Sequence, residues 1–124
     1  MDKIIVTDST KCKSGHYTGK IVKAESRMQP SKDKKTSYDM KDYYVQIDVS
    51  ATEKPELKVG FFKNISVSSD LIKFIAKLGF NTAVKSELDL DCVVGTVIEF
   101  DVINETRGNG TYSNIAVNTI TKKQ

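Results

Sequence analysis

The segment Ser68–Phe80, SSDLIKFIAKLGF, is the one stretch of this sequence whose apolar residues follow a helical period. These residues recur at spacings of three and four, so in a helix they would form one apolar stripe: Leu71, Ile72, Phe74, Ile75 and Leu78. Ser68 or Ser69 is suited to cap the first turn, and Gly79 suits the left-handed conformation that ends a helix. The sequence therefore predicts one helix here, with three candidate strands before it and two after it.

The first candidate strand, His16–Met28, is rich in β-branched and small residues and contains Gly19. A glycine inside a strand pattern predicts a bend or a bulge, as a small barrel needs where its first strand curls. Residues 29–40 hold one of two prolines and a cluster of Lys, Asp, Ser and Thr, a composition typical of a mobile loop. We therefore predict a bent first strand followed by a long loop.

The second and third strands are predicted from clean alternation in residues 41–50, KDYYVQIDVS, and 57–67, LKVGFFKNISV. The side chains expected to face inward are Tyr43, Val45, Ile47, Val49, Leu57, Val59, Phe61, Ile65 and Val67. Those expected on the outer side are Tyr44, Gln46, Asp48, Ser50, Lys58, Gly60, Phe62, Asn64 and Ser66. The two strands should form an antiparallel pair with one apolar and one polar side.

Two further strands are predicted after the helix, at residues 95–105 and 111–120, joined by a hairpin loop that contains Asn109-Gly110. Their expected inward side chains are Ile98, Phe100, Val102, Ile115 and Val117. Three strands, a lone helix and a closing hairpin are the order of an OB-fold. We therefore predict a mainly β protein, a five-stranded OB-fold barrel with one α-helix between strands 3 and 4.

A chain of 124 residues is expected to form one domain. We assign residues 15–121 to a single OB-fold domain, 1–14 to a flexible arm or short extra strand, and 122–124 to a tail. The sequence has no run of 18 apolar residues and no signal-peptide core, so we expect a cytoplasmic protein without membrane contact. Cys12 and Cys92 are expected to be free thiols.

The net charge of +3 is small but unevenly distributed. Residues 11–35 carry eight Lys and Arg against two acids, whereas residues 86–105 carry six acids and no base. A basic patch attracts polyanions. The alternative interpretation is a solvated surface with scattered lysines.

The residue types that carry catalysis are sparse. His16 is the only histidine, and Cys92 lies in an apolar run typical of a small core residue. The candidate residues for a divalent-metal cluster are the acids Asp89, Asp91, Glu99 and Asp101. Glu99 and Asp101 alternate with core residues, however, as solvent-facing strand carboxylates do. We therefore expect no enzyme, no catalytic or metal-binding residue and no cofactor.

A nucleic-acid interface is predicted on the outer side of strands 2 and 3 and on the two loops that flank it. Tyr44 and Phe62 project from the polar side of the sheet, where a ring has no packing role. Rings stack on bases while lysines neutralise the phosphates between them. The expected nucleic-acid-binding residues are Lys32, Lys34, Lys35, Tyr38, Tyr44, Lys58, Phe62, Arg107 and Tyr112. A register slip of one residue would instead expose Tyr43 and Phe61.

Several short motifs accompany this pattern: Leu78-Gly79 at the helix end, Val94-Gly95 before the fourth strand, and Gly110-Thr-Tyr-Ser-Asn-Ile115 in the last. With them the chain resembles, from about Gly15 onward, the phage-encoded single-stranded DNA-binding proteins of the OB-fold class. The resemblance implies sequence-independent coating of single strands in replication or recombination, in the host cytoplasm. Proteins of that class often end in an acidic tail, whereas this sequence ends Thr-Lys-Lys-Gln.

The resemblance implies single-stranded DNA as partner and leaves open RNA, a homodimer, and contacts with replication or recombination proteins. Two other functions remain as alternatives. One is a non-enzymatic protein-interaction or phage structural module that uses the same face. The other is a metal-dependent nuclease, since some nucleases are built on OB barrels.

Overall fold

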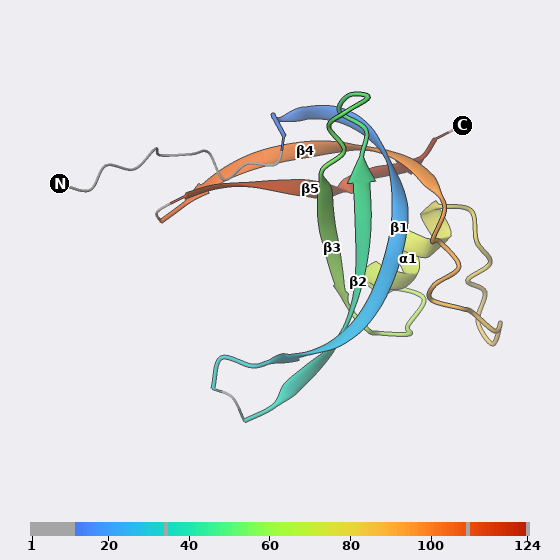
Figure 1. Cartoon of the computed structure of the whole chain (residues 1–124). Coiled ribbons are helices and arrows are strands. Elements are labelled where there is room, and N and C mark those ends of the chain that lie inside the picture. Colours follow the sequence, from blue (N-terminus) through green and yellow to red (C-terminus); the bar gives the residue numbers. More distant parts are fainter. Residues whose placement is uncertain (1–11, 34, 109, 124) are drawn as a thin grey trace.

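The computed structural model describes residues 12–33, 35–108 and 110–123 (Figure 1). Its elements are β1 (Gly15–Pro30), β2 (Ser37–Ile47), β3 (Glu56–Phe62), α1 (Asp70–Lys77), β4 (Val97–Arg107) and β5 (Gly110–Lys122). The chain is mainly β, with one short helix between the third and fourth strands, as predicted. Residues 1–11 of the predicted arm lie outside the described residues. In the described part, no helix is long and apolar enough to cross a membrane.

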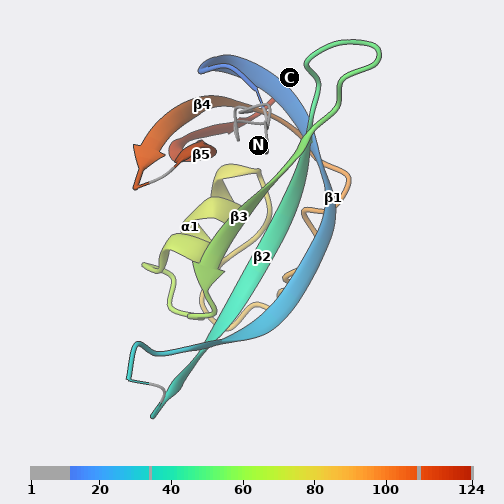
Figure 2. The ribbon, with the colours of Figure 1, turned by 60° about the vertical axis from the view of Figure 1, so that its left-hand side comes forward.

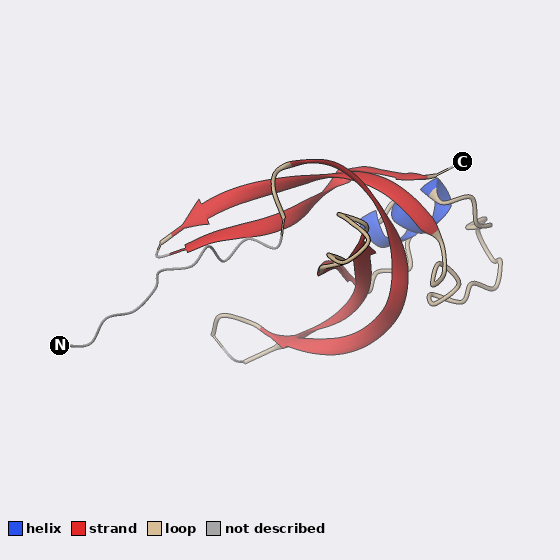
Figure 3. Cartoon of the chain, turned by 45° about the horizontal axis from the view of Figure 1, so that its top comes forward, coloured by secondary structure: helices blue, strands red, loops and turns tan. Residues whose placement is uncertain are grey.

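The five strands form one antiparallel sheet in the order β3-β2-β1-β4-β5. β1 is shared, because its first residues pair with β4 and the rest pair with β2, and the strand curves strongly between them (Figures 1 and 3). Gly19 has partners on both sides, and a Cβ there would lie 2.9 Å from Gln46 O. The predicted bend near Gly19 is confirmed, with a register shift between Ile21 and Lys23.

The sheet curls without closing. β3 and β5 are its end strands, and their Cα atoms come within 8 Å of each other, but no ladder joins them among the described residues. The hydrogen-bonded closure of a barrel is therefore not formed in the described part of the chain.

The helix α1 covers the open seam from inside, in contact with both β3 and β5 (Figure 2). The Phe74 ring packs 5.2 Å from Tyr43 and 4.8 Å from Phe61, measured between ring centroids. The helix is shorter than predicted, but its ends follow the sequence signals. Ser69 Oγ accepts a hydrogen bond from Ile72 N at 3.2 Å, and Gly79 has a φ of 93°.

The prediction of a long loop over residues 29–40 is wrong. The ladder between β1 and β2 runs to Pro30 and Ser37, which leaves a connection of residues 31–36. Both faces of this end of the hairpin are exposed, so its sequence carries no apolar alternation to reveal the strands. Pro30 is tolerated because it stands at the strand end, where a missing N–H costs little.

Three residues predicted to face inward are exposed: Ile65, Val67 and Val117. β3 ends at Phe62 because a turn follows, in which Asn64 Oδ1 accepts a hydrogen bond from Ser66 N at 3.0 Å. In β5 the register jumps opposite Glu99 and Asp101, and Thr119 Oγ1 takes the Asp101 N–H at 2.8 Å. This bulge turns Val117 to solvent and returns Ile120 to the core. The other inward residues of β4 and β5 are buried as predicted.

Candidate nucleic-acid interface

The outer face, defined as the side of β1–β3 turned away from α1, is built by three cross-strand rows. Ladder partners on the three strands make the rows Lys23–Tyr44–Lys58, Glu25–Asp42–Gly60 and Arg27–Met40–Phe62. In β2 and β3 the alternation of each strand sends these side chains outward, while neighbours such as Tyr43, Val59 and Phe61 enter the core. Tyr43 and Phe61 are buried, so the predicted register is confirmed and the one-residue slip is wrong.

Two rings stand exposed at one end of this face. The Phe62 residue is 63% exposed and the Tyr38 residue 47% exposed. Their centroids lie 5.6 Å apart with an interplanar angle of 76°, so the rings meet edge to face. The T-shaped pair fixes the orientation of both rings and leaves large parts of their surface open to solvent.

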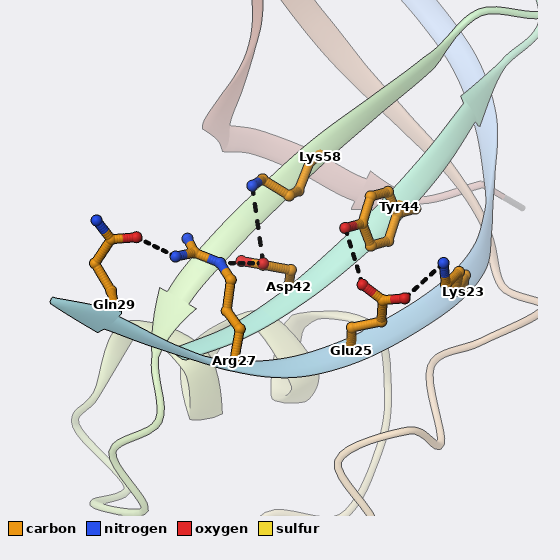
Figure 4. A network of polar contacts seen from close by, with 7 residues as sticks. All are labelled: Lys23, Glu25, Arg27, Gln29, Asp42, Tyr44 and Lys58. Carbon is orange, nitrogen blue, oxygen red and sulfur yellow. Dashed lines mark hydrogen bonds and ion pairs between the residues drawn. The ribbon is translucent and has the colours of Figure 1, made fainter. Parts of the chain in front are cut away.

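Tyr44 is half-buried and belongs to a polar chain along the same face (Figure 4). Its hydroxyl donates to Glu25 Oε2 at 3.1 Å, and the Lys23 ammonium lies 5.0 Å from its ring centroid and 2.6 Å from Glu25 Oε1. The hydrogen bond to Glu25 raises the pKa of Tyr44, and the Lys23 ammonium lowers the pKa of Glu25. Lys23 therefore already holds a cation against this ring.

Asp42 lies at the centre of the face and is sealed there. Arg27 and Lys58 converge on it from the two neighbouring strands, with Arg27 Nε bonded to Oδ2 and Lys58 Nζ 3.8 Å from the same oxygen (Figure 4). The Asp42 side chain is only 1% exposed. A buried carboxylate needs such cations, because desolvation without compensation is costly.

Two hairpins, β1–β2 and β4–β5, extend from the sheet toward the same side of the molecule (Figures 1 and 3). The turn of the first carries Lys32 and Lys35, both exposed, around Asp33, whose Oδ1 accepts from Lys35 N at 3.0 Å. Tyr112, 43% exposed, lies on the second hairpin. Lys34 and the side chain of Arg107 lie outside what the structure describes.

Of the predicted residues, the structure thus brings together on the outer face Tyr38, Tyr44, Lys58 and Phe62. Sequence reasoning missed four charged members of that face: Lys23, Glu25, Arg27 and Asp42. Asp42 lies two residues before Tyr44 on the same strand, so the alternation also predicts that it lies on the outer face. The outward residues of β1 could not be predicted by alternation, because the register shift between Ile21 and Lys23 changes which residues share a face.

A separate cluster joins β1 to β4 at His16, which sequence reasoning treated as an inert residue. Its Nδ1 lies 2.8 Å from Asp101 Oδ1, and its Nε2 lies 3.7 Å from Glu99 Oε1. The hydrogen bond to Asp101 raises the pKa of His16. Among the described residues, no three His, Cys, Asp or Glu side chains are arranged to hold a metal ion. Cys12 and Cys92 are free thiols, as predicted.

The sequence matches no protein-family model, and no curated protein matches it either. The chemistry of the outer face is therefore the main indication of function. That face combines exposed rings, ammonium groups and one sealed carboxylate.

Proposed function

We propose that this protein is an OB-type single-stranded DNA-binding protein that requires no defined recognition sequence. Bases stack on Phe62 and Tyr38 and, where Lys23 turns from the ring to a phosphate, on Tyr44; lysines of the outer face and the β1–β2 turn neutralise the phosphates. Such proteins serve replication or recombination by coating exposed strands.

The strand connectivity supports an open OB barrel. One long strand serves both halves of the sheet, a helix lies between the third and fourth strands, and the end strands approach each other over that helix. In OB-folds, oligonucleotides bind across strands 2 and 3, between the loops that join strands 1–2 and 4–5. The outer face and the two hairpins occupy the corresponding positions.

The exposed Phe62 ring is the observation that carries the proposal. A phenyl ring that is 63% exposed on a sheet gains little from the fold, whereas its chain neighbour Phe61 is 5% exposed. Base stacking on such a ring contributes about 1–3 kcal/mol per base and tolerates any base. Duplex DNA offers no exposed base faces, so the geometry favours single strands.

The ammonium groups beside the rings are available to phosphates at low cost. The side chains of Lys23 and Lys58 are 56% and 46% exposed, and each is paired with a carboxylate of the same face. The Lys23–Glu25 pair is exposed on both sides and contributes at most about 1 kcal/mol, so a phosphate can replace Glu25 as the partner of Lys23. Glu25 and Asp42 offset part of the positive charge, which favours moderate affinity.

Fluorescence anisotropy with a labelled oligo-dT and a duplex control tests the proposal. We expect the single strand to bind and a duplex of the same length to bind far more weakly. If about four phosphates are neutralised, raising salt from about 50 to 200 mM weakens binding roughly 50-fold. An RNA oligonucleotide of the same length in the same assay measures the preference between DNA and RNA.

The exposed rings also suit a protein partner, because aromatic side chains are enriched in protein interfaces. Absence of binding to any single strand would refute the DNA-binding proposal and favour the protein-interaction or phage structural module. Degradation of the oligonucleotide that depends on magnesium or calcium would instead indicate a nuclease. Sedimentation of the free protein and of its complex tests for a homodimer.

A further inference from the structure

One oxygen of the buried Asp42 carboxylate receives no hydrogen bond from the described residues. Oδ2 is engaged by Arg27 and Lys58, whereas Oδ1 is buried and unpartnered. Buried charged acceptors are normally satisfied, because leaving one without a donor is unfavourable. An unsatisfied oxygen at the centre of a candidate binding face indicates a donor that arrives with the ligand.

Only a residue without a side chain fits opposite this oxygen. Gly60 is the ladder partner of Asp42, and a Cβ at Gly60 would lie 2.7 Å from Oδ1. Gly60 and Phe62 also line an open cavity of about 410 Å³ that lies between the end of β3 and the start of α1, where Ser69 and Asp70 complete its wall. Phe62 lies two residues from Gly60 on the same face of the strand, so a planar group stacked on the ring can turn one edge toward the carboxylate.

We propose that Asp42 is a specificity-determining residue whose Oδ1 accepts a hydrogen bond from the exocyclic amine of a base stacked on Phe62. The inference rests on the proposed single-strand binding and adds a base preference at one position. Cytosine presents its N4 amine where thymine presents the O4 carbonyl. The carboxylate attracts the amine and repels the carbonyl oxygen, so this position favours cytosine over thymine.

Lys58 is the more weakly held of the two cations that cover the carboxylate. Its ammonium is 3.8 Å from Asp42 Oδ2, a distance longer than a hydrogen bond, and its side chain is 46% exposed. A bound strand supplies phosphates as stronger partners for this flexible cation. Lys58 then moves toward the backbone, while Arg27 continues to hold Oδ2 and keeps the carboxylate oriented.

Competition anisotropy with oligo-dC and oligo-dT of equal length tests this preference at pH 8, where cytosine is unprotonated. We expect wild-type protein to bind oligo-dC about 10- to 150-fold more tightly, the range for one hydrogen bond to a charged acceptor. Asp42→Asn should bring the ratio to about one or reverse it, because the amide can turn its NH₂ group toward thymine O4. The control Asp48→Asn removes an exposed carboxylate at the end of the face and should leave the ratio unchanged.

A second variant keeps the test decisive if Asp42→Asn unfolds the protein. Gly60→Ala places a methyl group against Oδ1 while Asp42 remains, so the ratio of oligo-dC affinity to oligo-dT affinity should fall to about one. Equal wild-type affinity for the two oligonucleotides, or an unchanged ratio in Gly60→Ala, would overturn the role of Asp42 and leave single-strand binding standing. Failure to bind either oligonucleotide would overturn both proposals.

Discussion

Replacing Phe62 by alanine separates binding from folding, because the adjacent Phe61 provides a matched control. Phe62 is 63% exposed, so about a third of its side chain is buried. Complete burial of a Phe side chain contributes about 1.5–3 kcal/mol, so Phe62→Ala should cost about 0.5–1 kcal/mol of folding stability. Phe61 is 5% exposed and packs against Phe74 and Tyr43, so Phe61→Ala should cost about 3–5 kcal/mol.

The effect on binding should follow the opposite order. Loss of one stacked base costs about 1–3 kcal/mol, so Phe62→Ala should weaken oligo-dT binding about 5- to 150-fold. Urea unfolding followed by circular dichroism gives the stabilities, and anisotropy at fixed salt gives the affinities. Phe61→Ala should bind nearly as wild type under conditions where it remains folded.

Two results would contradict this reasoning. An unchanged affinity of Phe62→Ala would show that bases do not stack on this ring. A loss of stability in Phe62→Ala comparable to that in Phe61→Ala would show that the ring supports the fold, and its exposure would then have no functional meaning.

Three further perturbations have defined outcomes. Lys58→Ala should lower the slope of log affinity against log salt by about 0.7, the value for one phosphate contact on a single strand; an unchanged slope excludes that contact. The hydrogen bond to the Asp101 carboxylate raises the pKa of His16 above its ordinary 6.5. The stability that protonated His16 adds to the fold is therefore present below pH 6.5 and is lost as the pH rises through the raised pKa. His16→Gln should therefore lower the urea midpoint more at pH 5.5 than at pH 8.5, and equal losses would refute the linkage. Gly19→Ala should destabilise the fold by about 1–3 kcal/mol in the same unfolding assay, because its methyl group would lie 2.9 Å from Val45 Cγ1; wild-type stability would mean that the bend relaxes freely.

The sequence was most informative where one side of an element is buried. Tyr43 and Phe61 are buried, whereas their chain neighbours Tyr44 and Phe62 lie on the outer face. The two-residue period of a strand places alternate residues on opposite faces. The apolar stripe of α1 was predictable for the same reason. Gly79 marked the helix end because few other residues adopt its positive φ.

Prediction failed where burial leaves no periodic trace. The end of the β1–β2 hairpin is solvated on both faces, so its polar composition predicts a loop where the structure has two strands. The bulge that exposes Val117 depends on Thr119 replacing a ladder partner, which apolar periodicity does not encode. The pairing of Arg27 with Asp42 spans two strands, and its register is set by the shift after Ile21.

The shared strand β1 also determines how this chain can fold. The β1–β2 and β2–β3 ladders are local hairpins, whereas His16 and Asp101, which meet across β1 and β4, are 85 residues apart in sequence. Closing so large a loop carries an entropic cost that must be met before the long-range contacts form, so we expect this step to limit the folding rate. The first three strands can therefore assemble early as a meander, and the terminal hairpin completes the molecule by docking along the short initial segment of β1.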